Sequence, residues 1–373
     1  MWSYLIYACA AGSLYMLIRG WQALELLGWQ RVWFVVMLLF PSLSFTLVRM
    51  RVVSGLLFDV CYVVGYFWLV AVLYGFIILL AIDIWRIIAR VGKIKPDFIY
   101  RNYPRTKAIL FGTVFLTLSV ILTAGYFNAQ LPRATHITIS VDKKAGQLTT
   151  LRIAMASDIH LGQFYGYKTV ERIVNTMNKH HPDIVVLVGD IFDGNPEPVI
   201  RNDMGAAFSR LQTRYGAYFV NGNHERAGER GNIAFDYLAS HGIQPLLDSV
   251  ALIDGSFYLA GRVDHSTRRR KTVPELLHGI NMRLPVILLD HQPVNLEEAE
   301  QAGVDLQLSG HTHHGQLVPL NYITGSMFEK DWGFLQKGKT NYYISCGTGT
   351  WGPPVRTAGY SEVVIIDLVF NTN

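Results

Sequence analysis

The chain has 373 residues, of which 50% are hydrophobic and only 16% are charged, with 33 lysines and arginines against 28 aspartates and glutamates. Its three cysteines are Cys9, Cys61 and Cys346, and only the last lies in the charged C-terminal part, so a disulfide within that part is excluded. The averages conceal two regions, because long apolar runs fill the sequence up to about Phe127, whereas charged, glycine-rich and β-branched segments alternate from about Arg133 onward.

Apolar runs in the N-terminal region have the length of membrane-spanning helices, which need about 20 predominantly apolar residues. The four runs are residues 2–18, 32–48, 55–85 and 108–127. The third is too long for one upright helix and too short for two helices with a turn, which predicts one tilted span. We therefore predict that residues 1–130 form an all-α transmembrane region of four helices and that residues 131–373 form a separate domain.

The C-terminal region begins with two strand patterns, residues 136–141 and 149–157, and the second leads into Asp158-Ile-His160. In an extended backbone residues i and i+2 point the same way, so Asp158 and His160 can converge on one cation. A carboxylate beside an imidazole suits a borderline divalent metal. Because short Asp-x-His triplets are common, this pair gains weight only from further ligand-type residues along the chain.

A helix pattern at residues 168–180 is followed by the apolar strand 184–188, of the kind that is buried on both faces. Strand, helix and strand in this order predict a parallel pair with a crossover helix. The strand leads into Gly189-Asp190-Ile-Phe-Asp193. A carboxylate at the carboxyl end of such a strand points into the crevice where α/β sheets place their ligands.

Further strand patterns also end in residues of the metal-ligand type. They are strand 217–220 with Asn223 and His224, strand 284–290 with His291, and strand 305–308 with His311 and His313. A tight turn would explain the glycine of Asn221-Gly-Asn223, but not the His-Glu pair directly after it. Several strand ends in succession finish in Asp, Asn or His, which chance rarely produces, so we predict one metal site built from all of them.

The order of these blocks resembles that of the calcineurin-like metallophosphoesterase superfamily. The five blocks are Asp158-x-His160, Gly189-Asp190-x-x-Asp193, Gly222-Asn223-His224-Glu225, His291 and Gly310-His311-x-His313. Residues 289–293, 310–316 and 347–354 look like the membrane-anchored bacterial branch of that superfamily. The resemblance runs from about residue 151 to the C-terminus, and it implies a four-layer α/β/β/α sandwich of two mixed β-sheets with metals at one edge.

The resemblance also implies two divalent cations, bridged by the Asp190 carboxylate. The first cation would be held by Asp158, His160, Asp190 and His313, and the second by Asp190, Asn223, His291 and His311. Two cations about 3.5–4 Å apart can activate a water molecule as hydroxide and clamp the phosphoryl oxygens of a substrate. A ligand set of oxygen and imidazole nitrogen suits Mn, Fe, Zn or Ni and leaves the choice among them open.

Other residues are assigned to the chemistry around the cations. His224 would protonate the leaving oxygen or stabilise the developing charge, and Asp193 would orient a metal ligand or His224 from behind. The basic run Arg268, Arg269 and Arg270 could receive an anionic substrate or a lipid headgroup. A solvated loop explains the same run equally well.

The sequence thus predicts a membrane-anchored hydrolase that uses a metal-bound hydroxide on a phosphomonoester, a phosphodiester or a lipid-linked pyrophosphate. Its partners would be that phosphoester and the membrane lipids. The alternative is a transporter or signalling protein whose helices carry a degenerate regulatory phosphoesterase-like domain. A missing ligand would favour the alternative, and none is missing.

The distribution of positive charge predicts the orientation in the membrane. The loop between the third and fourth runs contains Arg86, Arg90, Lys93, Lys95, Arg101, Arg105 and Lys107, whereas the loop between the second and third carries Arg49 and Arg51. Short loops rich in Lys and Arg stay in the cytoplasm. We therefore expect a multi-pass cell-membrane protein with its catalytic domain on the extracytoplasmic face, where it would meet no nucleic acid.

Overall fold

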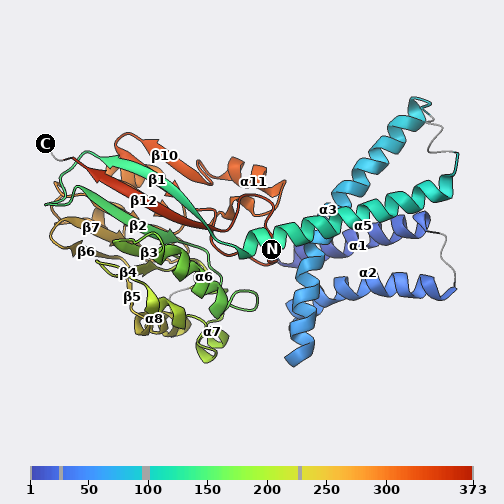
Figure 1. Cartoon of the computed structure of the whole chain (residues 1–373), viewed down its shortest axis with the longest axis horizontal. Coiled ribbons are helices and arrows are strands. Elements are labelled where there is room, and N and C mark those ends of the chain that lie inside the picture. Colours follow the sequence, from blue (N-terminus) through green and yellow to red (C-terminus); the bar gives the residue numbers. More distant parts are fainter. Residues whose placement is uncertain (1, 25–27, 95–100, 226–228, 372–373) are drawn as a thin grey trace. The chain divides into compact units, whose positions relative to one another are not determined.

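The computed structural model describes residues 2–24, 28–94, 101–225 and 229–371. The chain divides into two compact units, Met1–Tyr126 and Phe127–Asn373 (Figure 1). The first unit is helical. Its helices are α1 (Trp2–Ala23), α2 (Gly28–Arg49), α3 (Gly55–Val91) and α5 (Tyr103–Gln130), the last of which continues into the second unit.

Among the described residues, three helices are long and apolar enough to cross a membrane: α2, α3 and α5. The prediction of four spans was therefore one too many. The first predicted run does form α1, but Tyr4, Tyr7 and Ser13 dilute its hydropathy. The third run forms one helix of 37 residues, as predicted. At about 1.5 Å per residue α3 is ~55 Å long, well beyond the ~30 Å hydrocarbon core.

Within its described residues, the second unit contains two mixed sheets of six strands each. Sheet one has the order β1 (Arg133–Val141), β12 (Glu362–Phe370), β2 (Thr150–Ala156), β3 (Ile184–Val188), β4 (Ala217–Val220) and β5 (Ile243–Pro245). Sheet two has the order β10 (Gly333–Lys337), β11 (Thr340–Ile344), β9 (Leu306–Ser309), β8 (Val286–Leu289), β7 (Phe257–Gly261) and β6 (Ser249–Ile253). The mixed character comes from antiparallel pairs such as β12 with β2 and β10 with β11.

Apolar side chains form three clusters that separate the layers. The central cluster lies between the sheets and includes Ile153, Val186 and Leu308. A second cluster packs α6 (Tyr167–Asn178) and α8 (Glu229–Ser240) on sheet one, and a third packs α9 (Val273–Leu276) and α10 (Leu296–Gln301) on sheet two. The predicted four-layer sandwich is therefore confirmed. The remaining short helices are α7 (Glu197–Arg201), η1 (Ala206–Arg210), η2 (His313–Gly315) and α11 (Leu320–Met327).

The parallel strands of each sheet end at the same level. Ala156 of β2 pairs with Leu187 of β3, and Val188 of β3 pairs with Val220 of β4. In sheet two, Leu289 of β8 pairs with Leu308 of β9. Because the carboxyl ends of parallel neighbours meet at one edge, the loops after these five strands lie together.

Candidate metal centre

The predicted ligands come directly after these five strands, and five of them adopt a rare backbone conformation. Asp158, His160 and Asp190 have φ values of 53°, 53° and 50°, and His311 and His313 have values of 73° and 50°. Positive φ is uncommon for residues other than glycine. Each such residue costs about 1–3 kcal/mol and is typical of functional sites, where surrounding structure enforces it. The ends of β2, β3 and β9 therefore hold strained turns at predicted ligands.

Two glycines allow the loops to approach one another. A Cβ atom on Gly222 would lie 2.0 Å from Oδ1 of Asp190, and one on Gly310 would lie 2.3 Å from Oδ2 of Asp158. Any side chain at either position would displace a predicted ligand. The glycine of Asn221-Gly-Asn223 is thus required by close packing against Asp190.

In the described part of the chain, the ligand atoms form three groups in which all atoms lie within 4.8 Å of one another. They are Asp158 with His160 and His313, His160 with Asp190 and His224, and Asp190 with His291 and His311. The Nε2 atoms of His160 and His313 are 3.1 Å apart, and Nε2 of His291 lies 3.3 Å from Oδ2 of Asp190. The groups overlap at His160 and Asp190, so they form one continuous centre.

Unsatisfied polar atoms show that this centre fits cations. Nε2 of His291 and Oδ1 of Asn223 are buried and have no hydrogen-bond partner among the described residues. Nδ1 of His291 donates to the carbonyl oxygen of Val188 at 2.8 Å, so the other ring nitrogen, Nε2, is the one that faces Asp190. A buried polar atom without a partner costs about 1–3 kcal/mol. Carboxylate, imidazole and amide donors together suit divalent metals.

The centre attracts positive charge. Burial lowers the pKa of His291, but the adjacent Asp190 carboxylate outweighs this effect and holds that pKa well above its ordinary value. Burial likewise raises the pKa of Asp190, yet His291, His160 and His224 together hold it far below its ordinary value. The carboxylate is therefore ionised and negative, which suits a metal ligand.

His224 stands at the open side of the centre. Its side chain is 20% exposed, whereas that of His291 is fully buried. Nδ1 of His224 lies 3.5 Å from Oδ1 of Asp193, and the same oxygen lies 3.7 Å from Nδ1 of His160. Burial lowers the pKa of His224, but Asp193 and then Asp190 reverse this and raise it to about 9. Such an imidazole carries a proton that it can give to a bound group.

Two further residues shape the centre and were not assigned a role from the sequence. Glu225 is buried and accepts hydrogen bonds from the backbone N–H groups of Asp190, Phe192 and Gly222 at 3.0, 2.7 and 2.7 Å. Arg356 is buried as well, and it donates to the carbonyl oxygens of His313 and Gly349 at 3.1 and 2.7 Å.

The sequence indicated little about the roles of these two residues. The Glu225 position directly after Asn-His marked it as unusual, but only the fold shows that it joins two ligand loops. Arg356 comes after a proline-rich turn whose sequence gives no indication of burial.

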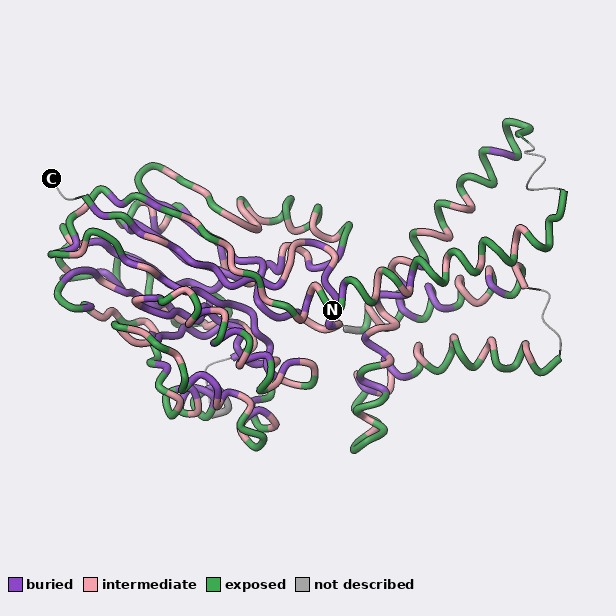
Figure 2. The backbone as a smooth tube through the Cα atoms, viewed as in Figure 1, coloured by how far each residue is buried: buried purple, intermediate pink, exposed green. Residues whose placement is uncertain are grey.

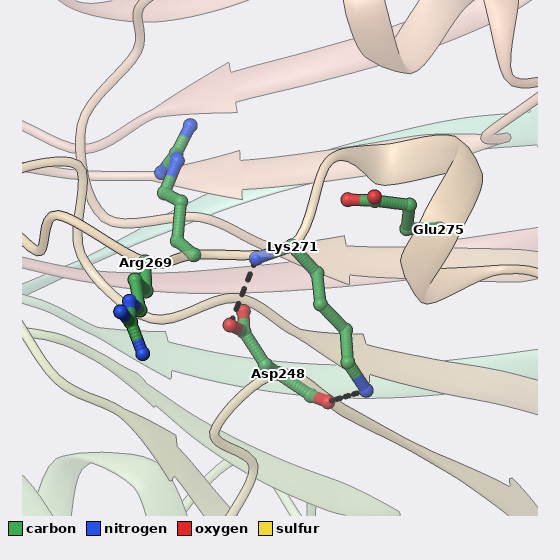
Figure 3. Close-up of a pocket in the computed structure, with 5 residues that line it drawn as sticks. Asp248, Arg269, Lys271 and Glu275 are labelled. Atoms are coloured by element: carbon green, nitrogen blue, oxygen red, sulfur yellow. Dashed lines mark hydrogen bonds between the residues drawn. The ribbon is translucent and has the colours of Figure 1, made fainter.

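The basic run divides into two parts. Arg270 donates to Oδ1 of Asp290 at 2.9 Å, and Arg262 pairs with the other oxygen of that buried carboxylate at 3.0 Å. Arg268 and Arg269 are exposed. Arg269 lines a shallow cleft of about 460 Å³ with Asp248, Arg270, Lys271 and Glu275 (Figure 3). Lys271 donates to Asp248 in this cleft, which therefore carries both signs of charge.

Comparison with known proteins identifies the family of the chain. Residues 151–315 match the family of calcineurin-like phosphoesterases. A Danio rerio "Transmembrane protein with metallophosphoesterase domain" is 32% identical over 314 residues, covering 78% of this chain and 70% of the relative. An "Uncharacterized metallophosphoesterase" of Aquifex aeolicus is 33% identical over 260 residues, covering 67% of this chain and 97% of the relative. The crystal structure of TT1561 of Thermus thermophilus has a TM-score of 0.33 and 13% identity, over 54% of this chain and 92% of that one. The chain thus belongs to the calcineurin-like phosphoesterase family, as a membrane-associated hydrolase of phosphoester bonds.

Proposed function

We propose that this membrane-associated enzyme hydrolyses a phosphomonoester, a phosphodiester or a lipid-linked pyrophosphate at a centre of two divalent cations. One observation carries the proposal: the Asp190 carboxylate belongs both to the ligand group with His160 and to the group with His291 and His311. A carboxylate shared in this way is what a pair of cations about 3.5–4 Å apart requires.

The first cation would be held by Asp158, His160, Asp190 and His313, and the second by Asp190, Asn223, His291 and His311. The geometry supports this division, because His160 and His313 belong to one ligand group and His291 and His311 to another. The partnerless Oδ1 of Asn223 supports its place in the second set. When bound, the cations supply the charge that polarises the phosphoryl oxygens and activates water. Mn, Fe, Zn and Ni all suit this donor set.

His224 completes the chemistry as the proton donor. In the hydrolysis a water oxygen bonds to phosphorus, the bond from phosphorus to the leaving oxygen breaks, and His224 gives that oxygen a proton. The proton that the attacking water loses passes through solvent and restores the proton on His224. Asp193, 3.5 Å from Nδ1 of His224, positions the imidazole so that Nε2 faces the centre. General acids placed in this way contribute roughly 10²–10⁴-fold to a rate.

We also propose that the protein is multi-pass and that its catalytic domain works on the extracytoplasmic face. The three apolar helices support the first point, and the positive charges between residues 86 and 107 support the second.

Full-length protein in nanodiscs provides the test of function. Metal content per chain is measured by elemental analysis, and hydrolysis is followed on p-nitrophenyl phosphate, bis(p-nitrophenyl) phosphate and a polyprenyl diphosphate. We expect about two cations per chain, activity on at least one ester, and loss of activity on chelation with recovery on metal return. Full activity in chelated, metal-free protein would contradict the proposal.

A further inference from the structure

Helix α11 (Leu320–Met327) presents apolar side chains to the surface without covering any core. None of its eight residues is buried, and none carries a charge. Tyr322, Ile323 and Met327 are 74%, 54% and 71% exposed, and Val318 just before the helix is 39% exposed. A helix in water normally buries its apolar stripe and turns charged residues outward. We refer to Val318, Tyr322, Ile323 and Met327 as the α11 patch.

Within the second unit, one loop, residues 356–359, contacts both the end of α5 and the start of the α11 patch. Nδ2 of Asn128, in the last turn of α5, donates to the carbonyl oxygens of Arg356 and Gly359 at 3.1 and 2.9 Å. Between these residues, Oγ1 of Thr357 accepts from the backbone N–H of Val318 at 3.0 Å. Residues 356–359 therefore hold the end of α5 and the start of the α11 patch.

This position favours one occupant for the patch, the lipid bilayer. α5 is apolar and long enough to cross a membrane, so the bilayer surface lies within a few residues of Asn128. Arg133 and Tyr360 stack beside this exit, with the guanidinium 5.4 Å from the ring centre, and Trp332 packs on Tyr360 at 5.5 Å. Tyr, Trp and Arg are typical of the headgroup level of a membrane. An apolar helix at that level buries its face about 5–10 Å into the interface.

The same helix is tied to the metal centre at both ends. It comes after η2, which contains His313, and the ring of Phe328 after its last turn packs against His311 at 6.1 Å. Oδ2 of Asp331 accepts from Thr324 of α11 at 2.9 Å and lies 2.8 Å from Nδ1 of His314. A change in the position of α11 would therefore reach the loop that carries His311 and His313.

We infer that α11 lies in the membrane surface and that the centre acts on a phosphoester carried by the headgroup of a membrane lipid. The substrate part of this inference rests on the proposed function, whereas the membrane contact stands on the α11 patch and the exit of α5. A phosphoryl group held at the bilayer surface reaches the centre without leaving the membrane. Soluble phosphoesters gain nothing from the α11 patch.

Photo-crosslinking tests the membrane contact independently of activity. A benzophenone side chain replaces Tyr322 in the full chain, reconstituted in nanodiscs of phosphatidylethanolamine and phosphatidylglycerol. The control replaces Leu252, which is 50% exposed on β6, at the opposite edge of sheet two from β10. Mass spectrometry after irradiation should find lipid adducts at position 322 and none at position 252. Absence of lipid at 322, or adducts only to a second copy or another protein, would overturn the inference.

A kinetic comparison tests the substrate class. The double variant Ile323→Glu and Met327→Glu is compared with Leu252→Glu, using bis(p-nitrophenyl) phosphate in solution and vesicles that carry phosphatidic acid, phosphatidylglycerol or a polyprenyl diphosphate. We expect kcat/KM on the lipid to fall about tenfold or more in the double variant, with kcat/KM on the soluble ester within about twofold of wild type. The Leu252 variant should match wild type on both.

The outcomes separate the two proposals. Equal losses on both esters, or no loss on the lipid, would overturn the lipid substrate. Lipid adducts at position 322 in a protein that hydrolyses none of these esters would refute the proposed function and leave the membrane contact in place.

Discussion

The two units of this protein use apolar residues in opposite ways. In the sandwich Leu151 and Ile153 are completely buried, whereas Leu56 and Val91 of α3 are 79% and 78% exposed. Figure 2 shows the contrast along the whole chain, with purple strands in one unit and largely green and pink helices in the other. Burial in the sandwich removes apolar surface from water. The helices leave theirs for lipid, which is equally apolar, so exposure has a different meaning in each unit.

Polar residues show the complementary difference. In the helices, the buried hydroxyls of Ser13 and Ser44 donate to the carbonyl oxygens of Cys9 and Phe40, one turn earlier, at 2.7 and 2.8 Å. In the sandwich, Asn223 and His291 each have a buried atom without a partner among the residues that the structure describes. These two serines are thus satisfied within their own helices, whereas the open atoms of Asn223 and His291 belong to predicted metal ligands.

The largest expected effect concerns the side of the membrane on which each unit is found. Protease added to intact cells, or to spheroplasts where an outer membrane is present, should digest the sandwich completely and leave the helical unit as a protected fragment. The charges between residues 86 and 107 are the reason. A sandwich that survives until the membrane is broken would place the centre in the cytoplasm.

The next largest effect is a loss of metal and activity that leaves the fold unchanged. Asp190→Asn should abolish hydrolysis and lower metal content, because the shared carboxylate serves both ligand sets, while the circular dichroism spectrum stays that of wild type. Asp236→Asn, on the exposed face of α8, is the matched control and should change neither quantity. A variant at Asp190 with two cations per chain and full turnover would contradict the shared-ligand assignment.

These assignments show how far the sequence alone reached. Strands β3 and β4 begin and end where the pattern predicted, and the ligand blocks come directly after them, because apolar runs and strand-end triplets are local signals. The partners of Glu225 and Arg270 come from distant segments, so no local pattern contains them. Local signals can also be overlooked. Asp254-Gly255, with φ values of 49° and 65°, is a hairpin turn of the Asp-Gly kind between β6 and β7, and neither strand was predicted.

Removing the proton donor should have the third effect. His224→Ala should keep the metal content and lower turnover roughly 10²–10⁴-fold on esters with poor leaving groups. Esters with activated leaving groups should lose much less, because they need no proton. Steady-state kinetics over a series of leaving groups measures how the loss of turnover depends on the leaving group. An equal loss along the series would show that His224 acts on the transferred phosphoryl group instead.

Glu225→Gln should weaken the sandwich without affecting the helices. The amide has one acceptor where the carboxylate has two, and its NH₂ group faces backbone donors, so we expect a loss of about 1–3 kcal/mol in the free energy of unfolding of the second unit. Denaturant titration measures this loss. Glu171→Gln is the control. Its partner Arg210 lies at the surface, 3.1 Å away, so its change should stay below about 1 kcal/mol.

The smallest expected effects are changes in stability that distinguish Arg268 and Arg269 from Arg270. Arg268→Ala and Arg269→Ala should leave stability within about 0.5 kcal/mol of wild type, since both side chains are exposed. Arg270→Ala should be clearly destabilising, because it removes one of two cations from buried Asp290. Thermal unfolding ranks the three variants. A rise in KM confined to the Arg268 and Arg269 variants would support their predicted contact with an anionic substrate, and unchanged KM in both would favour the solvated loop.

The left-handed turns at the ligands have a consequence for how this domain can evolve. Glycine adopts such a conformation without strain and asparagine with little, so replacing His160 or His313 by either should relieve strain at a φ of 53° or 50°. Drift under selection for stability alone would therefore erase these histidines first. Keeping histidine at these two positions would then require selection for catalysis, and a lineage that gave up hydrolysis would be expected to carry Gly or Asn there.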